Sequence, residues 1–194
     1  MPTLFKTADW QCALECGRCD HVKPGGVRCR NRVCVGTPTC WVHTAALYGV
    51  RAKTSTIAGA GKGLFATRDF AANEWICPYV GEAIGQACLD ARYPGDVTAP
   101  YVEMLPGGRG YVDSACMRGI GSLANALFTN AGRCRSLGQH NAKASFRRGL
   151  GQTWLKTTKR VARGAEIFHY YGAAYRLEDG HVTKSARGAD TRPC

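Results

Sequence analysis

The sequence predicts a mainly β protein of the α+β class, built from small sheets with few short helices and preceded by a small metal-binding segment. Three observations lead to this prediction. Residues 48–80 and 153–171 consist of short apolar and β-branched runs broken by turn residues, which is typical of short strands. Gly59, Gly61 and Gly63 occupy alternate positions of one stretch, and residues 1–50 carry a dense group of cysteines.

Individual elements follow from the local patterns. We expect a strand over residues 75–80, and the proline inside it restricts that strand to a sheet edge or a bulge, because proline cannot donate to a ladder. A short helix is expected over 89–92 and a hairpin over 101–113, around Pro-Gly-Gly. Residues 153–161 and 166–171 should each form one strand.

Length and charge limit the possible classes of protein. The chain has 194 residues, with 26 Lys and Arg against 14 Asp and Glu, giving a net charge of +12. Such a charge favours a polyanionic partner, nucleic acid or a nucleosome, and is equally compatible with a solvated basic surface. No apolar run approaches the roughly 20 residues of a membrane helix, and residues 1–10 lack a signal-peptide core. We therefore expect no membrane partner and an intracellular protein, whose reduced cysteines bind metal and form no disulfides.

Residues 1–50 have the spacing of a zinc-binding segment. Cys40 and His43 form a knuckle in which two ligands grip one ion from a tight turn. Thiolates and imidazoles in sets of four suit zinc, and the segment holds too little apolar material to fold without an ion. The preferred structural zinc ligands are Cys19, Cys29, Cys40 and His43.

Several alternatives stay open for this segment. Cys34 is a substitute for Cys29, and Cys12 with Cys16 are candidates for a second site. Buried cysteines without metal are a further alternative. Bracing of the following domain is the favoured role, and contact with nucleic acid is the alternative. The basic residues that favour the alternative are Arg18, Lys23, Arg28, Arg30 and Arg32.

The glycines of the stretch Ser55–Ala66 predict a tight turn on which a ligand can lie, since glycine permits positive φ and close backbone approach. An ordinary hairpin turn would produce the same pattern. Other short motifs follow it along the chain. They are Tyr-Val-Gly-Glu at 79–82, Tyr-Val-Asp at 111–113, Leu-Ala-Asn at 123–125, Asn-Ala at 141–142 and the run from Gly164 to Gly172, which includes Tyr-Tyr-Gly.

In this order, the motifs resemble the SET-domain family of protein lysine methyltransferases over residues 51–175. The resemblance implies a SET-domain, β-clip-like fold and S-adenosyl-L-methionine as the methyl donor. Its implied cofactor residues are Gly61, Lys62, Gly63, Asn125 and Tyr171. The implied catalytic residues are Tyr171, which orients the amine, and Tyr79. The implied substrate channel is formed by Tyr79, His169 and Tyr111.

The chain departs from the family pattern in its asparagine motif. The usual arginine is Ser122, the usual histidine is Ala126, and an insert separates Asn125 from Asn141. Only one cysteine follows the terminal tyrosine, so the family's C-terminal zinc knot is absent. Another element, such as Tyr175 or the tail, would have to close the lysine channel.

The implied activity is methylation of a protein lysine, with a histone tail as the expected substrate and a nuclear or chromatin location. Lysine has an ordinary pKa of about 10.4, so the amine must lose a proton before it attacks the methyl group. The alternative is a catalytically inactive SET-like module that binds chromatin or nucleic acid. We expect a zinc segment at 1–50, a SET domain at 51–175 and a flexible basic tail at 176–194. An acidic groove for a basic substrate could be formed by Glu74, Glu82, Asp90, Asp96, Glu103 and Asp113.

Overall fold

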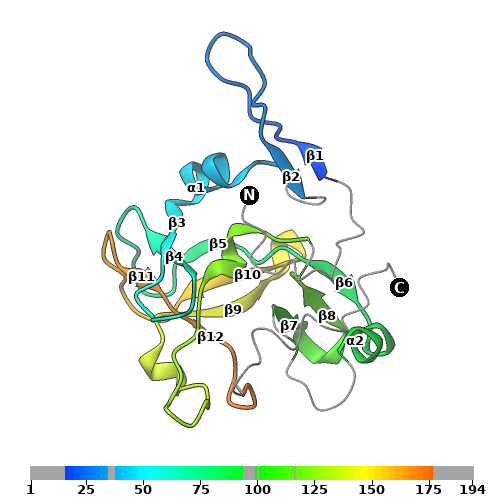
Figure 1. Ribbon diagram of the computed structural model, residues 1–194, viewed down its shortest axis with the longest axis vertical. Helices are drawn as coiled ribbons and strands as arrows, with labels where there is room; N and C mark the ends of the chain where they lie inside the picture. The colour runs from blue at the N-terminus through cyan, green and yellow to red at the C-terminus, as the bar shows by residue number, and fades with distance from the viewer. Residues whose placement is uncertain (1–15, 35–37, 94–98, 100, 116, 177–194) are drawn as a thin grey trace.

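The computed structural model describes residues 16–34, 38–93, 99, 101–115 and 117–176. In these residues, short strands form four small sheets, accompanied by two short α-helices (Figure 1). The prediction of a mainly β fold with few short helices is therefore confirmed. The predicted C-terminal tail, apart from Arg176, lies outside the described residues.

The N-terminal segment projects from the rest of the protein as a hairpin (Figure 1). Strand β1 (Cys16–Arg18) pairs antiparallel with β2 (Arg32–Cys34). Helix α1 (Trp41–Tyr48) follows and ends at Gly49, whose left-handed φ of 69° terminates the helix. Helix α1 then leads directly into β3, so the segment is continuous with the main body.

A three-stranded sheet carries the glycine turn. Its order is β11-β4-β3, with β3 (Val50–Thr54), β4 (Lys62–Ala66) and β11 (Glu166–Ile167) all antiparallel to their neighbours. The C-terminal part of the chain thereby lies beside the strand that leaves the turn.

The four-stranded sheet has the order β12-β9-β10-β5. Its strands are β5 (Trp75–Pro78), β9 (Ala142–Arg147), β10 (Gln152–Thr157) and β12 (His169–Tyr170). Strand β5 lies at the edge and its register with β10 shifts, which confirms the position expected from its proline. The single strand expected over 166–171 is wrong: the chain changes sheets at Phe168, whose amide donates to the Asn141 side chain.

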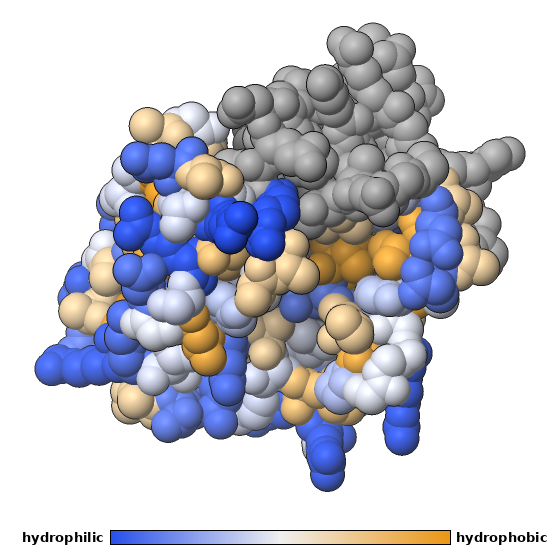
Figure 2. Space-filling view, turned by 90° about the horizontal axis from the view of Figure 1, so that it is seen from below, coloured by the Kyte–Doolittle hydropathy of each residue, from blue (hydrophilic) through white to orange (hydrophobic). Residues whose placement is uncertain are grey.

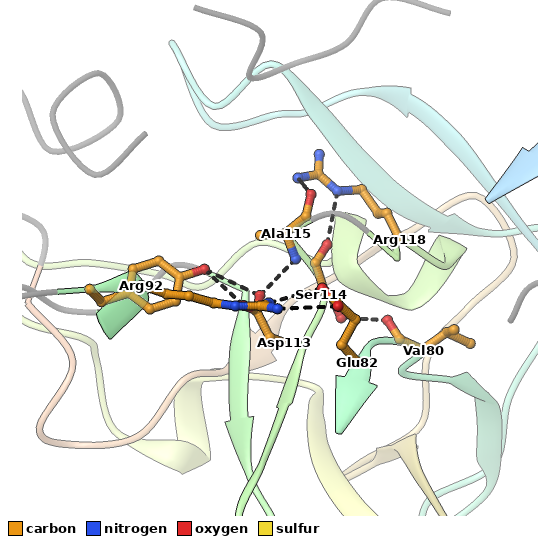
Figure 3. A network of polar contacts seen from close by, with 8 residues as sticks. Val80, Glu82, Arg92, Asp113, Ser114, Ala115 and Arg118 are labelled. Carbon is orange, nitrogen blue, oxygen red and sulfur yellow. Dashed lines mark hydrogen bonds and ion pairs between the residues drawn. The ribbon is translucent and has the colours of Figure 1, made fainter. Parts of the chain in front are cut away.

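The fourth sheet, β6-β8-β7, is stabilised by a buried arginine. It contains β6 (Glu82–Ile84), β7 (Val102–Met104) and β8 (Tyr111–Asp113), and helix α2 (Gln86–Arg92) follows β6. The Arg92 side chain, only 2% exposed, donates to Glu82 at 2.9 Å and to Asp113 at 2.8 Å (Figure 3). The network ties the helix to β6 and β8 and holds β8 in place for its pairing with β7.

The main hydrophobic core is formed by the β11-β4-β3 sheet, the β12-β9-β10-β5 sheet and the segment 120–124, which begins as a 3-10 helix. Its central side chains include Val50, Leu64, Phe70, Ile76 and Leu155. Among the residues that the structure describes, large exposed hydrophobic side chains are few, and in the face seen in Figure 2 hydrophilic residues surround small hydrophobic groups. Within the described ranges, no helix has the length and apolar character needed to cross a membrane. Cys88 is disulfide-bonded, so the expectation that all cysteines are reduced is wrong at this position.

Candidate functional site

The glycine turn leaves part of its backbone open. Gly59 and Gly61 have left-handed φ angles of 77° and 70°, which favour glycine. No atom lies within 4 Å of the place where a Cβ on Gly59 would be, and Lys62 is exposed. An accessible backbone of this kind suits a bound cofactor, as expected for Gly61 and Lys62.

Gly63 has a different role, because it is closely packed against Glu166. The Glu166 carboxylate, in a residue only 5% exposed, accepts hydrogen bonds from the Ser55 hydroxyl at 2.7 Å and the Thr56 amide at 2.7 Å. The Thr56 hydroxyl donates to it as well. A Cβ on residue 63 would collide with this carboxylate. Glycine is therefore required at this position if Glu166 is to hold the turn through Ser55 and Thr56.

Asn125 joins the glycine turn to the C-terminal strand. Its side-chain amide donates to the Lys62 carbonyl at 2.9 Å, and its own carbonyl accepts from the His169 amide at 2.8 Å. The preceding carbonyl, that of Ala124, accepts from the Tyr171 hydroxyl at 2.9 Å. Four of the sequence-predicted residues, Lys62, Asn125, His169 and Tyr171, are thus brought together from distant parts of the chain.

Tyr171 lies within a group of aromatic side chains, here called the aromatic cluster: Tyr79, Phe128, His169, Tyr171 and Tyr175. Ring centroids are 5.1 Å apart for His169 and Tyr171, and 5.8 Å apart for Tyr79 and His169. Tyr175 lies 5.0 Å from Tyr171, and Phe128 contacts both. Tyr175 and the insert residue Phe128 therefore pack against Tyr171 and against each other.

Burial keeps the polar groups of the cluster uncharged. It raises the pKa of Tyr79 and of Tyr171 well above the usual range for tyrosine, so both retain their hydroxyl protons. It also lowers the pKa of His169 to about 3, so this ring is neutral at physiological pH. Because the Tyr171 hydroxyl donates to a carbonyl, its oxygen lone pairs remain available to accept a hydrogen bond from an amine.

The second asparagine and its neighbour organise the insert. Asn141 bridges β11 and β12: its side chain donates to the Glu166 carbonyl at 2.9 Å and accepts from the Phe168 amide at 2.8 Å. The adjacent His140 is fully buried and accepts from the Leu127 amide at 2.9 Å. His140 thus fixes the start of the insert that carries Phe128, a role that sequence motifs did not indicate.

Some predicted residues lie outside this arrangement. The Tyr111 hydroxyl donates to Gln86 of α2 at 2.6 Å, and none of the ring contacts among the described residues joins Tyr111 to the aromatic cluster. The expected acidic groove is also altered, because Glu82 and Asp113 bind Arg92 (Figure 3). Glu103, in contrast, reaches the cluster, with its Oε1 atom 3.1 Å from His169 Nε2. Asp96 lies outside the described residues.

The four preferred zinc ligands meet at one point. The ligand atoms of Cys19, Cys29, Cys40 and His43 all lie within 4.8 Å of one another. His43 Nδ1 is 3.4 Å from the sulfur of Cys19 and 3.3 Å from that of Cys40. These separations are close to the roughly 3.8 Å between ligands of a tetrahedral zinc ion with bonds of about 2.3 Å. The donor set and its spacing therefore fit Zn²⁺.

Amide groups around the cluster suit thiolate ligands. The Cys40 amide donates to the Cys19 sulfur, and the side-chain and backbone amides of Asn31 donate to Cys40 and Cys29. Cys12 and the side chains of Cys16 and Cys34 lie outside the described part of the structure, so the second zinc site and the substitute ligand stay predictions.

Two of the basic residues in the zinc segment stabilise the segment itself. Arg18 donates to the carbonyls of Cys29 and Arg28 at 2.8 Å each. Arg28 donates to the carbonyls of Cys19 and Arg18 and forms an ion pair with Asp20. These contacts cross-link the two arms of the hairpin, so these two arginines stabilise the segment, while its bracing of the following domain and its contact with nucleic acid both stay predictions.

Known proteins resemble the part of the chain that contains both Gly61 and Tyr171. The family model described as SET domain matches residues 61–172. Among curated proteins, no sequence matches the chain. A solved structure of Chaetomium thermophilum Polycomb Repressive Complex 2 bound to GSK126 contains a chain with 23% identity and a TM-score of 0.50. An apo ctPRC2 structure in an autoinhibited state contains one with 20% identity and the same TM-score. Each match covers 65% of this chain but only 16% of the solved chain, so the likeness concerns the fold.

Proposed function

Because this chain belongs to the SET-domain family, whose members are generally protein lysine methyltransferases, we propose that it methylates a protein lysine with S-adenosyl-L-methionine as donor. The observation that carries this proposal is the junction at residues 124–125. There, Ala124 accepts from Tyr171 while Asn125 holds the glycine turn. The predicted amine-binding tyrosine and the predicted cofactor turn thus lie on either side of one short segment.

In the methyl transfer step, the protein mainly aligns the amine with the methyl donor and excludes water. The donor supplies an electrophilic methyl group on a sulfonium, and in-line attack by a neutral amine requires the two groups to be aligned. Tyr171 orients the amine through its oxygen lone pairs, and Tyr79 forms the buried wall beside it. Gly61, Lys62 and Asn125 hold the donor through the open turn. No acid–base pair is needed for the methyl transfer step itself.

We assign a structural role to zinc. Its four ligands belong to the N-terminal segment, and none belongs to the aromatic cluster. An ion there would fix the start of α1 and hence the direction in which the chain enters β3. Loss of zinc should therefore destabilise the protein before it affects the methyl-transfer chemistry.

The expected substrate is a histone tail, and a nuclear, chromatin-associated location follows from that substrate. The family supplies this expectation, and the net charge of +12 is compatible with contact with nucleosomal DNA. The alternative function is an inactive SET-like module that binds chromatin. It is favoured by the altered asparagine motif, in which Ser122 donates only to the Gly119 carbonyl inside the fold.

One experiment separates these functions. Methyl transfer from labelled S-adenosylmethionine is measured with core histones, nucleosomes and other basic proteins, and binding of S-adenosylhomocysteine is measured by calorimetry. We expect label on a lysine of a histone and its loss in Tyr171→Phe, with cofactor binding retained. Tyr170→Phe, which alters the neighbouring half-buried tyrosine outside the cluster, serves as the control. Absence of both methyl transfer and cofactor binding in the wild type would favour the binding module.

A further inference from the structure

The aromatic cluster contains one acidic neighbour whose role the proposed function leaves open. Glu103 is the central residue of β7, and its backbone pairs with the apolar residue Val112 of β8. Its Oε1 atom is 3.1 Å from His169 Nε2, and its side chain is 19% exposed. Burial, with the negative charge of Glu103 as the next cause, raises the pKa of Tyr79. A carboxyl group therefore lies among the side chains that would surround a lysine amine, within reach of solvent.

The position of Glu103 is held by the buried arginine network. Val102, its neighbour in β7, pairs with Asp113, which is fully buried and binds Arg92 at 2.8 Å (Figure 3). Because β8 is anchored in this way, its partner β7 holds the Glu103 side chain in a fixed position. A group that acts on a substrate needs such a fixed position.

Its contact with His169 favours the protonated form of Glu103. The Ala144 amide donates to His169 Nε2 at 3.1 Å, so this nitrogen acts as an acceptor and carries no proton. An ionised Glu103 places a negatively charged oxygen 3.1 Å from this electron-rich nitrogen, and a proton on the carboxyl group removes that repulsion. The site is thus prepared to stabilise Glu103 after it has gained a proton.

Glu103 is the group in the described cluster best suited to accept a proton near neutral pH. Burial raises its pKa to about 8, from an ordinary value of 4.5. His169, with a pKa of about 3, is too weak a base, and the tyrosines are already protonated. The titratable or charged groups around Glu103 and its tyrosine neighbours are Tyr79, Tyr101, Arg118, Cys134, His169, Tyr171 and Tyr175.

We propose that Glu103 is the general base that accepts the proton lost by the ammonium group of the target lysine. This inference rests on the proposed methyltransferase function. The proton moves from Nζ to the carboxylate, and the neutral amine then attacks the methyl carbon of the sulfonium donor. The N–C bond forms as the C–S bond breaks, and its electron pair remains on sulfur. Glu103 returns its proton to solvent through the exposed part of its side chain.

The test uses the pH dependence of kcat/KM between pH 7 and 10 for the wild type and Glu103→Gln. We expect a loss of about a hundredfold at pH 7.5, a typical effect of removing a general base. The loss should shrink to a few-fold by pH 10, because solution then deprotonates lysine, whose pKa is about 10.4. Asp69→Asn, at an exposed carboxylate outside the acidic groove set and the aromatic cluster, should follow the wild type at every pH.

A loss that is the same at every pH, or no loss, would overturn the proposal and leave Glu103 with a structural role or none. Binding of S-adenosylhomocysteine checks that the variant is folded. If Glu103→Gln does not fold, Glu103→Ala is assayed with added formate, and recovery of activity at pH 7.5 supports the base whereas its absence overturns it. A wild type that neither transfers methyl groups nor binds S-adenosylhomocysteine refutes the proposed function itself, and the inference with it.

A second readout does not depend on activity. In ¹³C NMR of protein labelled at glutamate carboxyl groups, the resonance missing from Glu103→Gln should titrate near pH 8. Titration near the ordinary value of 4.5 would overturn the assignment of this group as a base for near-neutral pH.

Discussion

Replacing Gly63 with alanine tests whether the glycine turn is held by Glu166. The added Cβ would collide with the Glu166 carboxylate and lie 2.9 Å from its Cδ and 3.3 Å from the Ser55 Cα. Moving the carboxylate away weakens three hydrogen bonds, two from Thr56 and one from Ser55. Hydrogen bonds to a charged group contribute about 1.5–3 kcal/mol each. With partial relaxation of the side chain, we expect Gly63→Ala to cost about 3–5 kcal/mol.

A cost of this size should be easy to measure. For a protein of about 200 residues, it corresponds to a fall in Tm of roughly 10 °C. Gly138→Ala is the matched control, because no atom lies within 4 Å of its added Cβ and its φ is not left-handed. Thermal unfolding of both variants, with calorimetry of S-adenosylhomocysteine, separates loss of the turn from loss of the fold. Equal melting temperatures for the two variants would refute the packing argument.

A double-mutant cycle isolates the contact itself. Glu166→Ala removes the group with which the new Cβ collides, at the cost of the three hydrogen bonds. In the Gly63→Ala, Glu166→Ala double variant we expect a total cost at least 1 kcal/mol smaller than the sum of the single costs, since contacting residues are coupled by about 0.5–3 kcal/mol. If the cost of the double variant equals the sum of the two single costs, contact with Glu166 is not the reason that glycine is needed at position 63.

Three further predictions concern the metal, the arginine network and pH. Metal analysis should find at least one zinc ion per chain, with one ion fewer in Cys40→Ser and no loss in Val42→Ala; zinc-free wild type would contradict the assignment. Arg92→Met leaves the fully buried carboxylate of Asp113 and the partly buried one of Glu82 without their arginine partner and should lower the free energy of unfolding by about 3–5 kcal/mol in urea titrations. Arg160→Ala, which breaks an exposed ion pair, should cost less than about 1 kcal/mol, and similar costs for both would be inconsistent with the network. Because the pKa of Glu103 is raised from 4.5 to about 8, the folded state binds more protons within that window, so stability falls as pH rises through it. Glu103→Gln should reduce this slope in thermal melts, and an unchanged slope would count against the raised pKa.

Much of the candidate site could be predicted where the chemistry depends on local spacing. The knuckle formed by Cys40 and His43 is visible in the sequence because its ligands are three residues apart. The position of β5 at a sheet edge follows from the missing amide proton of Pro78. The order of motifs from the glycine turn to Tyr171 led to the family, and the match over residues 61–172 confirms it.

Other parts of the site could not be read from the chain. Glu103 was one of several acidic residues that could have faced a substrate. Its strand β7 and the strand β12 that carries His169 belong to different sheets, so their contact depends on how these sheets lie against each other. Tyr111 belongs to a motif of the right composition, but its hydroxyl donates to α2. The sequence also predicted one strand over 166–171, whereas the structure divides it between two sheets.

By itself, the sequence determined the pairing of Cys40 with His43, the glycine turn, the family and the place of Tyr171 in the last motif, because each depends on residue types at short or regularly ordered spacing. Tertiary structure alone decided that Phe128 and Tyr175 pack against Tyr171, that Glu166 makes Gly63 necessary and that Glu103 lies beside His169. The physical reason is that contacts between residues distant in sequence depend on how sheets pair and pack. Burial then sets the pKa of a carboxyl or imidazole, and burial is a property of the packed fold.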